Sequence, residues 1–151
     1  MAPNPSALAT RITGAARLGG IVGNPVAHSL SPVIHNAWLQ AAGADAVYAA
    51  FAPRDAEGFD ALAAAGRAGL VAGLNVTAPF KEQAFSLADE ATAAARAVGS
   101  ANILVFRDGR VLADSADGEG VLYALAEQAP ALSLQGARVV ILGAGGAARA
   151  A

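Results

Sequence analysis

Short apolar runs alternate along the chain with longer segments in which apolar residues recur every three or four positions. The short runs are typical of buried strands, and the periodic segments are typical of amphipathic helices. Strands are therefore expected near residues 18–23, 46–52, 70–76, 101–106, 110–113 and 138–142, and helices near residues 31–43, 55–69, 79–87, 89–98 and 118–128. This alternation predicts an α/β fold with a mostly parallel sheet flanked by helices.

Polar, proline and glycine residues mark the ends of these elements. Ser31 followed by Pro32 predicts a helix start in which Ser31 caps the free amides. Asp55 and Asp89 are the predicted caps of two later helices. The segment 107–109, Arg-Asp-Gly, predicts the turn of a β-hairpin.

Composition and charge exclude several classes of protein. The chain of 151 residues is 55% hydrophobic, which is enough for a core, and its net charge of −2 argues against general nucleic-acid binding. Because there is no cysteine, disulfides, thiolate zinc sites and thiol nucleophiles are excluded, and we expect no metal. No apolar stretch reaches the ~18 residues of a membrane span. The first residues carry arginine but no acid, as transit peptides do, yet we favour a short tail and a cytoplasmic protein.

Ser29 and Ser31 are the first candidate binding residues. They lie two residues apart immediately before a predicted helix, whose free amides and partial positive charge attract anions. Together the two hydroxyls and these amides could bind a carboxylate. The alternative is that Ser31 only caps the helix and Ser29 lies in a turn.

Asn75, Thr77 and Lys81 follow a predicted strand, where α/β sheets place their ligands. Asn75 and Thr77 alternate along an extended chain and project to one side, and Lys81 lies one helical turn beyond. A lysine held beside an asparagine and a threonine at a strand end is a candidate functional residue. The alternative is an ordinary solvated lysine.

Asn102 and Asp117 complete the polar candidates. Asn102 offers both a donor and an acceptor, which suits a ring diol, although it could also be a plain turn residue. Asp117 stands at a predicted helix start, where a capping carboxylate is the simple interpretation. If Asp117 pairs with Lys81, the two provide a proton carrier and a charge that orients it.

A glycine-rich turn follows the last predicted strand. Its pattern is GxGxxA, a variant of the dinucleotide-binding fingerprint, in which glycines allow a tight turn and close approach of a pyrophosphate. The candidate cofactor residues are Gly143, Ala144, Gly145, Gly146 and Ala147. A dinucleotide-binding unit needs about 30 residues, so we expect this chain to be the N-terminal piece of a longer protein.

Five segments, in order and at matching intervals, resemble the shikimate dehydrogenase family. The family's Ser-x-Ser-Pro occurs at 29–32, its Asn-Val-Thr-x-Pro-x-Lys at 75–81 and its Gly-Ala-Gly-Gly-Ala at 143–147. Its Gly-Ala-x-Asn-Thr and Asn-Thr-Asp-x-x-Gly occur in altered form at 99–103 and 115–120. The departures are Ile103, Ser115 and Ala116, and the lost hydrogen bonds are expected to loosen Asn102 and Asp117 or to signal a divergent substrate.

The resemblance implies a tail at 1–17, a substrate-binding domain at 18–130 and the truncated start of a Rossmann domain at 131–151. It also implies the reversible, NADP-dependent reduction of 3-dehydroshikimate to shikimate, on the route to chorismate and the aromatic amino acids, by a monomer or homodimer. Ser29, Ser31 and Thr77 would hold the substrate carboxylate. Lys81, Asn102 and Asp117 would hold ring hydroxyls with Asn75 in support, and Lys81 would be the acid–base residue. Gly143 to Ala147 would face the NADP pyrophosphate.

Two alternatives stay open at this stage. One is a dehydrogenase of the same fold that acts on quinate or another analogue, and the other is a binding module without catalysis. The presence of both Lys81 and Asp117 argues against the module. NADP cannot be distinguished from NAD, because the segment that reads the difference is absent from these residues.

Overall fold

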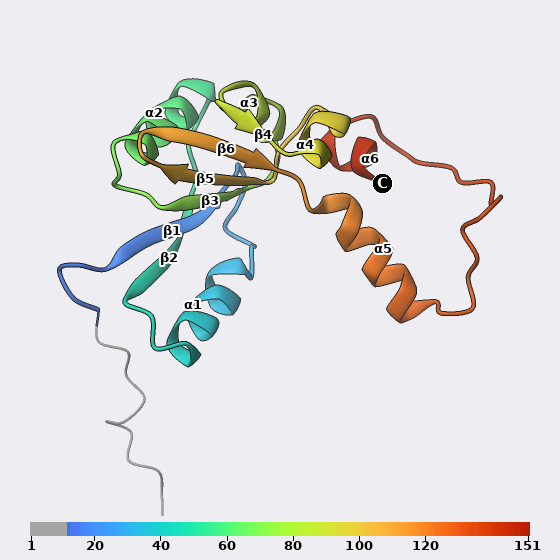
Figure 1. Ribbon diagram of the computed structural model, residues 1–151, viewed down its shortest axis with the longest axis horizontal. Helices are drawn as coiled ribbons and strands as arrows, with labels where there is room; N and C mark the ends of the chain where they lie inside the picture. Colours follow the sequence, from blue (N-terminus) through green and yellow to red (C-terminus); the bar gives the residue numbers. More distant parts are fainter. Residues whose placement is uncertain (1–11) are drawn as a thin grey trace, which may run out of the picture.

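The computed structural model describes residues 12–151, so most of the expected tail, residues 1–11, lies outside the described residues. The described residues form six strands and six helices (Figure 1). The strands are β1 (Arg17–Val22), β2 (Ala46–Phe51), β3 (Gly73–Val76), β4 (Glu90–Ala91), β5 (Ile103–Arg107) and β6 (Arg110–Asp114). The helices are α1 (Ser31–Ala41), α2 (Ala56–Arg67), α3 (Lys81–Ser86), α4 (Ala93–Val98), α5 (Asp117–Gln128) and α6 (Gly146–Ala150).

All six strands form one sheet in the order β2-β1-β3-β5-β6-β4. The pairings β1–β2, β1–β3 and β4–β6 are parallel, whereas β3–β5 and β5–β6 are antiparallel. The predicted α/β class is therefore confirmed, and the antiparallel pairs come from the predicted hairpin β5–β6, whose turn contains Asp108 and Gly109 at positive φ. The first strand of the hairpin, β5, pairs antiparallel with β3, so the sheet is mixed.

Side chains on the two faces of the sheet pack against different helices. Val22 faces the main core, which lies under α2 and α3, while the preceding Ile21 faces α1. The main core comprises Val22, Phe59, Val71, Leu74, Val76, Phe80, Ala84, Ala101, Leu104, Phe106, Val111 and Ala113. A smaller cluster of Ile21, Val26 and Tyr48 packs with Leu39 beneath α1. These helices lie on opposite sides of the sheet in Figure 1.

The predicted helix caps are confirmed at one position and wrong at another. Asp55 caps α2, because its Oδ1 accepts a hydrogen bond of 2.8 Å from the Gly58 amide. Asp89 caps nothing: the chain enters the short strand β4 first, and Thr92 caps α4 instead. The Asp89 carboxylate bonds across to β6 and α2, accepting from the Val111 amide at 2.7 Å and from Arg67 at 2.6 Å.

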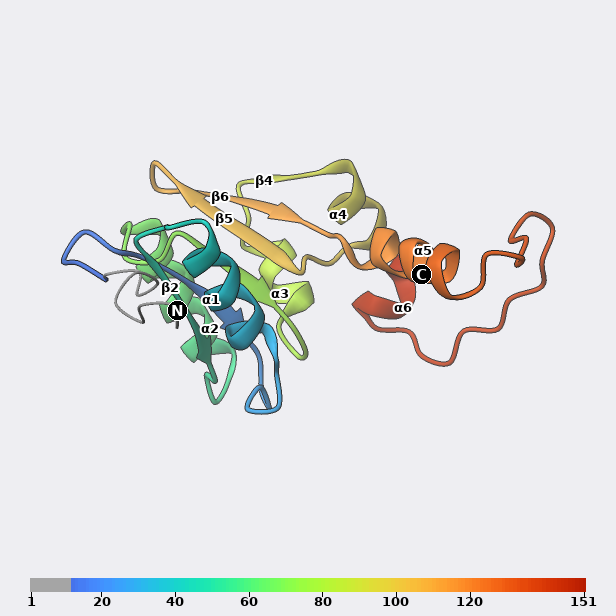
Figure 2. The ribbon, with the colours of Figure 1, turned by 90° about the horizontal axis from the view of Figure 1, so that it is seen from below.

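The strand predicted over 138–142 is not formed. These residues are exposed, with Val140 at 85% and Leu142 at 95%, and among residues 12–151 no strand lies beside them to pair with. A parallel strand needs hydrogen-bonded neighbours, so an apolar run by itself does not make one. Figure 2 shows α5, α6 and the long connection between them projecting beyond the sheet.

Candidate functional site

Two loops lie side by side where β1 and β3 end. β1 and β3 are parallel neighbours, so the loops that follow them leave from the same edge of the sheet. The Asn24 amide donates to the Ala78 carbonyl at 3.0 Å, and the Thr77 amide donates to the Val22 carbonyl at 2.9 Å. This edge is where α/β sheets bind ligands, and it carries the serine segment and the lysine segment together.

Lys81, Asn102 and Asp117 form a hydrogen-bonded cluster at this edge. Lys81 begins α3, Asp117 begins α5, and Asn102 immediately precedes β5. Lys81 Nζ lies 2.5 Å from Asp117 Oδ2, and Asn102 Nδ2 donates to Asp117 Oδ1 at 2.7 Å. The Lys81 and Asp117 side chains are 18% and 22% exposed, so the pair is sheltered yet open to a ligand. The three predicted residues are brought together.

Asp117 does not cap its own helix. The cap position of α5 is Ala116, and no side chain accepts a hydrogen bond there. Asn102 Oδ1 instead accepts from the Ala116 amide at 3.0 Å, so Asn102 bonds to both residues at the helix start. The simple capping interpretation of Asp117 is therefore wrong, and its two oxygens are turned toward Lys81 and Asn102. Asn102 and Asp117 stay anchored although the sequence departs from the family pattern at Ser115 and Ala116.

The two serines are arranged differently from the prediction. Ser31 is the first residue of α1, and its side chain does not cap the helix. The Oγ of Ser29 accepts from the Ser31 amide at 3.2 Å, so Ser29 occupies part of the capping role. Because α1 starts one residue earlier than a Ser31 cap would require, the Ser31 hydroxyl is not engaged by a helix amide. Both serines are half-buried beside the shared edge.

Asn75 has a partner that sequence reasoning missed. The phenol of Tyr48, on β2, donates to Asn75 Oδ1 at 2.7 Å. The Ser31 side chain is hydrogen-bonded to the same phenol. In the sequence, Tyr48 has the pattern of a core residue of a strand. The feature that could have revealed the contact is its hydroxyl, because a buried tyrosine hydroxyl usually has a hydrogen-bond partner.

The glycine-rich turn faces the lysine segment across a cleft of about 450 Å³. Thr77, Lys81 and Glu82 line one side, and Gly145, Gly146 and Ala147 line the other. Gly143 has a φ of +133°, which side chains rarely adopt. A Cβ on Gly146 would come within 2.6 Å of Ser100 Oγ, so only glycine allows this approach. The Gly145 amide region is open, with no atom within 4 Å of its Cβ position, which fits a bulky anionic group.

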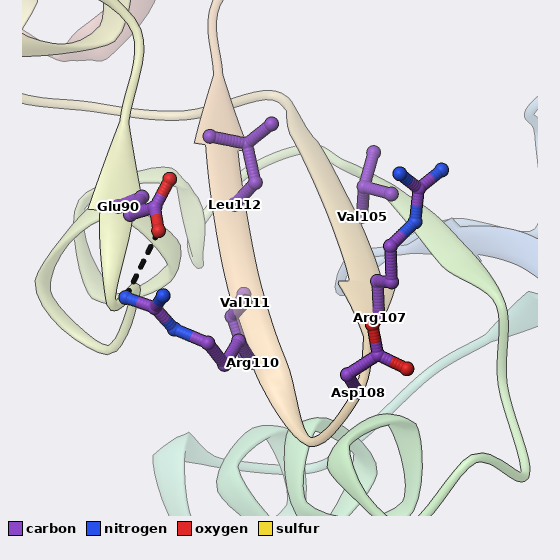
Figure 3. Close-up of a pocket in the computed structure, with 7 residues that line it drawn as sticks. All are labelled: Glu90, Val105, Arg107, Asp108, Arg110, Val111 and Leu112. Carbon is purple, nitrogen blue, oxygen red and sulfur yellow. Dashed lines mark ion pairs between the residues drawn. The ribbon is translucent and has the colours of Figure 1, made fainter.

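Another hollow, of about 350 Å³, lies over the hairpin and contains none of the predicted site residues. Figure 3 shows its side chains on β4, β5, β6 and the turn between β5 and β6, including the ion pair Arg110–Glu90 at 2.9 Å. Both partners of that pair are more than half exposed, which makes it weak. The cleft beside Lys81 is therefore the better candidate for chemistry.

No helix of residues 12–151 is long and apolar enough to span a membrane.

The family model described as "Shikimate dehydrogenase substrate binding domain" matches residues 21–104. Among curated proteins, a shikimate dehydrogenase (NADP(+)) of Caulobacter vibrioides is 57% identical over 141 residues, covering 93% of this chain and 49% of the relative. One of Maricaulis maris is 52% identical, covering 91% and 48%. The chain thus spans about half the length of the curated relatives it matches.

Solved structures agree in fold. A shikimate dehydrogenase from Aquifex aeolicus has a TM-score of 0.79 and 37% identity, covering 93% of this chain and 52% of that one. A shikimate 5-dehydrogenase from Thermus thermophilus, solved in complex with shikimate, has a TM-score of 0.77 and 33% identity, covering 89% and 50%. At 33% and 37% identity, these structures resemble the chain in sequence as well as in fold.

Proposed function

The chain belongs to the shikimate dehydrogenase family, and on that basis we propose that it provides the substrate-binding half of an NADP-dependent enzyme that reversibly reduces 3-dehydroshikimate to shikimate. The observation that carries this proposal is the cluster of Lys81, Asn102 and Asp117. It places an ammonium, an amide and a carboxylate together at the sheet edge. Lys81 of this cluster also lines the cleft that faces the glycine-rich turn. This arrangement suits a ring ketone that must receive both a hydride and a proton.

We assign Lys81 as the acid–base group. In the reducing direction its ammonium donates a proton to the oxygen that becomes the new hydroxyl, and in the reverse direction its amine accepts that proton. Asp117 holds Lys81 by the 2.5 Å contact. Asp117 accepts hydrogen bonds from ring hydroxyls, and the Asn102 amide donates to them. The pair therefore binds the reacting oxygen and keeps the proton carrier beside it.

We assign the substrate carboxylate to Ser29, Ser31 and Thr77. The hydrogen bond between the loops, from Asn24 to Ala78, keeps the serine segment next to Thr77. Hydrogen bonds from hydroxyls to a carboxylate are stronger than those between neutral groups, so three hydroxyls suffice to orient an anionic ring acid. Asn75, on β3, supports the residues that hold the ring hydroxyls.

NADP supplies the hydride when it is bound. The glycine-rich turn, Gly143 to Ala147, is the segment of this chain that would hold its pyrophosphate. The open surface at Gly145 and the close approach at Gly146 fit that role, because side chains there would block an anionic group or push the turn away from Ser100. A monomeric or homodimeric state and a cytoplasmic location stay predictions that accompany this proposal.

The test is a steady-state assay of the full-length protein that carries this chain. Shikimate and quinate are each offered with NADP⁺ and with NAD⁺, and reduced cofactor is followed by absorbance. We expect kcat/KM to be highest for shikimate with NADP⁺. Turnover that prefers quinate, or no turnover with either acid, would overturn the proposal.

A further inference from the structure

Tyr48, on β2, contacts two residues that we assign to the substrate site and that lie on other elements, Ser31 on α1 and Asn75 on β3. Its hydroxyl donates to Asn75 Oδ1 at 2.7 Å and is hydrogen-bonded to the Ser31 side chain. Tyr48 lies in register with Gly19 of β1, which pairs in turn with Gly73 of β3. Because neither glycine carries a side chain, the tyrosine ring has room to cross β1 and reach Asn75.

The hydroxyl of Tyr48 remains a hydrogen-bond donor throughout the working range of pH. Burial raises the pKa of the Tyr48 phenol to about 12, and the hydrogen bond from Ser31 opposes this rise only in part. A neutral phenol that donates to Asn75 Oδ1 selects one orientation of the planar amide. The amide nitrogen of Asn75 then points away from Tyr48 with both of its hydrogens available.

Tyr48 is itself held in place from α1. Its backbone amide donates to Asn36 Oδ1 at 3.0 Å, and Asn36 Nδ2 donates back to the Tyr48 carbonyl at 2.8 Å. The ring of His35 stacks on the Tyr48 ring, with centroids 4.1 Å apart and planes inclined by 7°. The phenol therefore has a fixed position relative to both α1 and the sheet.

We propose that Tyr48 is a positioning residue of the substrate site, which orients the Asn75 amide and holds the Ser31 hydroxyl at the start of α1. The proposal rests on the proposed function, because it takes Asn75 and Ser31 as substrate contacts. Tyr48 does not touch the substrate itself. Its phenol joins the strand that carries Asn75 to the helix that carries Ser31, so that both contacts keep one geometry.

Tyr48→Phe in the full-length enzyme is the direct test, because it removes one oxygen and leaves the ring to pack. We expect KM for shikimate to rise about three- to tenfold, the effect of one lost hydrogen bond, with kcat changed less than about twofold. Tyr123→Phe is the matched control, since Tyr123 lies on α5 and is 74% exposed. Its KM should equal that of the wild type. Melting temperatures of both variants show whether each is folded.

A double-mutant cycle separates positioning from general loosening of the fold. In an Asn75→Ala background, Tyr48→Phe should raise KM by less than it does in the wild-type background, because the amide that it orients is gone and only the contact with Ser31 remains. An unchanged KM in Tyr48→Phe alone, or an undiminished effect in the Asn75→Ala background, would overturn the proposal. If the wild-type enzyme fails to oxidise shikimate, the proposed function fails first, and the two failures are distinguishable.

Discussion

Lys81 and Asp117 are thirty-six residues apart in the chain, yet their charged atoms lie 2.5 Å apart. Each residue begins a helix, and the two helices start at the same edge of the sheet. The contact depends on the β5–β6 hairpin, which returns the chain to this edge before α5 begins. The Lys81 ammonium is thus fixed beside the Asp117 carboxylate, which also accepts a hydrogen bond from Asn102.

Replacing Lys81 with alanine should remove the proton carrier. We expect Lys81→Ala in the full-length enzyme to lower kcat by about 10²–10⁴, the usual range for a lost acid–base group, with a smaller change in KM. Glu57→Gln is the control, because Glu57 is an exposed charged residue on α2, away from the cleft. Steady-state kinetics measure both, and near-wild-type turnover in Lys81→Ala would refute the assignment.

Asp117→Asn tests the anion separately. The substitution keeps the size of the side chain but turns a carboxylate oxygen beside Lys81 into a neutral group. We expect kcat/KM to fall by about 10- to 100-fold, which corresponds to a lost hydrogen bond to a charged group of about 1.5–3 kcal/mol. Glu119→Gln, an exposed position in the same first turn of α5, should leave kcat/KM unchanged. Equal kinetics in the two variants would exclude a role for the ion pair.

The two serines should differ in stability but not in binding. Ser29→Ala and Ser31→Ala should each weaken shikimate binding by about 1.5–3 kcal/mol. Only Ser29 accepts from the Ser31 amide, so Ser29→Ala should also lower the melting temperature, as loss of a cap of about 0.5–2 kcal/mol does. Calorimetric titration and thermal melts measure the two effects. A larger loss of stability in Ser31→Ala would restore the capping role that the sequence predicted.

Most of the fold could be predicted because its signals are local. The Asp55 cap and the Arg-Asp-Gly turn act within a few residues, and the structure contains both. The strand β4 could not be predicted, since two residues carry no period and it exists only by pairing with β6. The strand predicted over 138–142 was wrong for the opposite reason. Its pattern is that of a strand, but it has no neighbouring strand to pair with among the described residues.

The candidate site divides in the same way. The motifs identified Lys81, Asn102 and Asp117 as site residues. The order of these residues in the chain could not show that the Asp117 carboxylate bonds to both Lys81 and Asn102. Tyr48 was missed because its partner Asn75 lies two strands away, across β1. Contacts of that kind depend on strand order, and a single sequence does not reveal strand order when hairpin and parallel connections are mixed.

Asp89 should make the stability of the domain depend on pH. The hydrogen bond from Arg67 and then that from the Val111 amide hold the pKa of this carboxyl below its ordinary value. A lowered pKa in the folded state stabilises the fold above the unfolded value of about 4, and this contribution is lost as the pH falls through the folded pKa. Asp89→Asn should therefore lower the melting temperature at pH 7, and the difference from wild type should shrink below pH ~4. The exposed Glu127→Gln should show no such difference at either pH.

The polypeptide of residues 1–151 should bind shikimate without transferring hydride. The residues assigned to substrate lie between 29 and 117, and the sheet and its helices hold them in place. In this polypeptide the glycine-rich turn, by contrast, runs into α6, a helix of only five residues that begins at Gly146, and the run before the turn is exposed and unpaired. The amides of the turn lack the rigid strand and crossover helix that a pyrophosphate site requires.

Calorimetric titration with shikimate should give a signal that Lys81→Ala and Asp117→Asn weaken, while NADPH consumption with 3-dehydroshikimate should stay at background. Measurable turnover by this polypeptide would show that the cofactor site needs less of the fold than we infer, and absence of binding would show that substrate contacts depend on residues beyond those assigned.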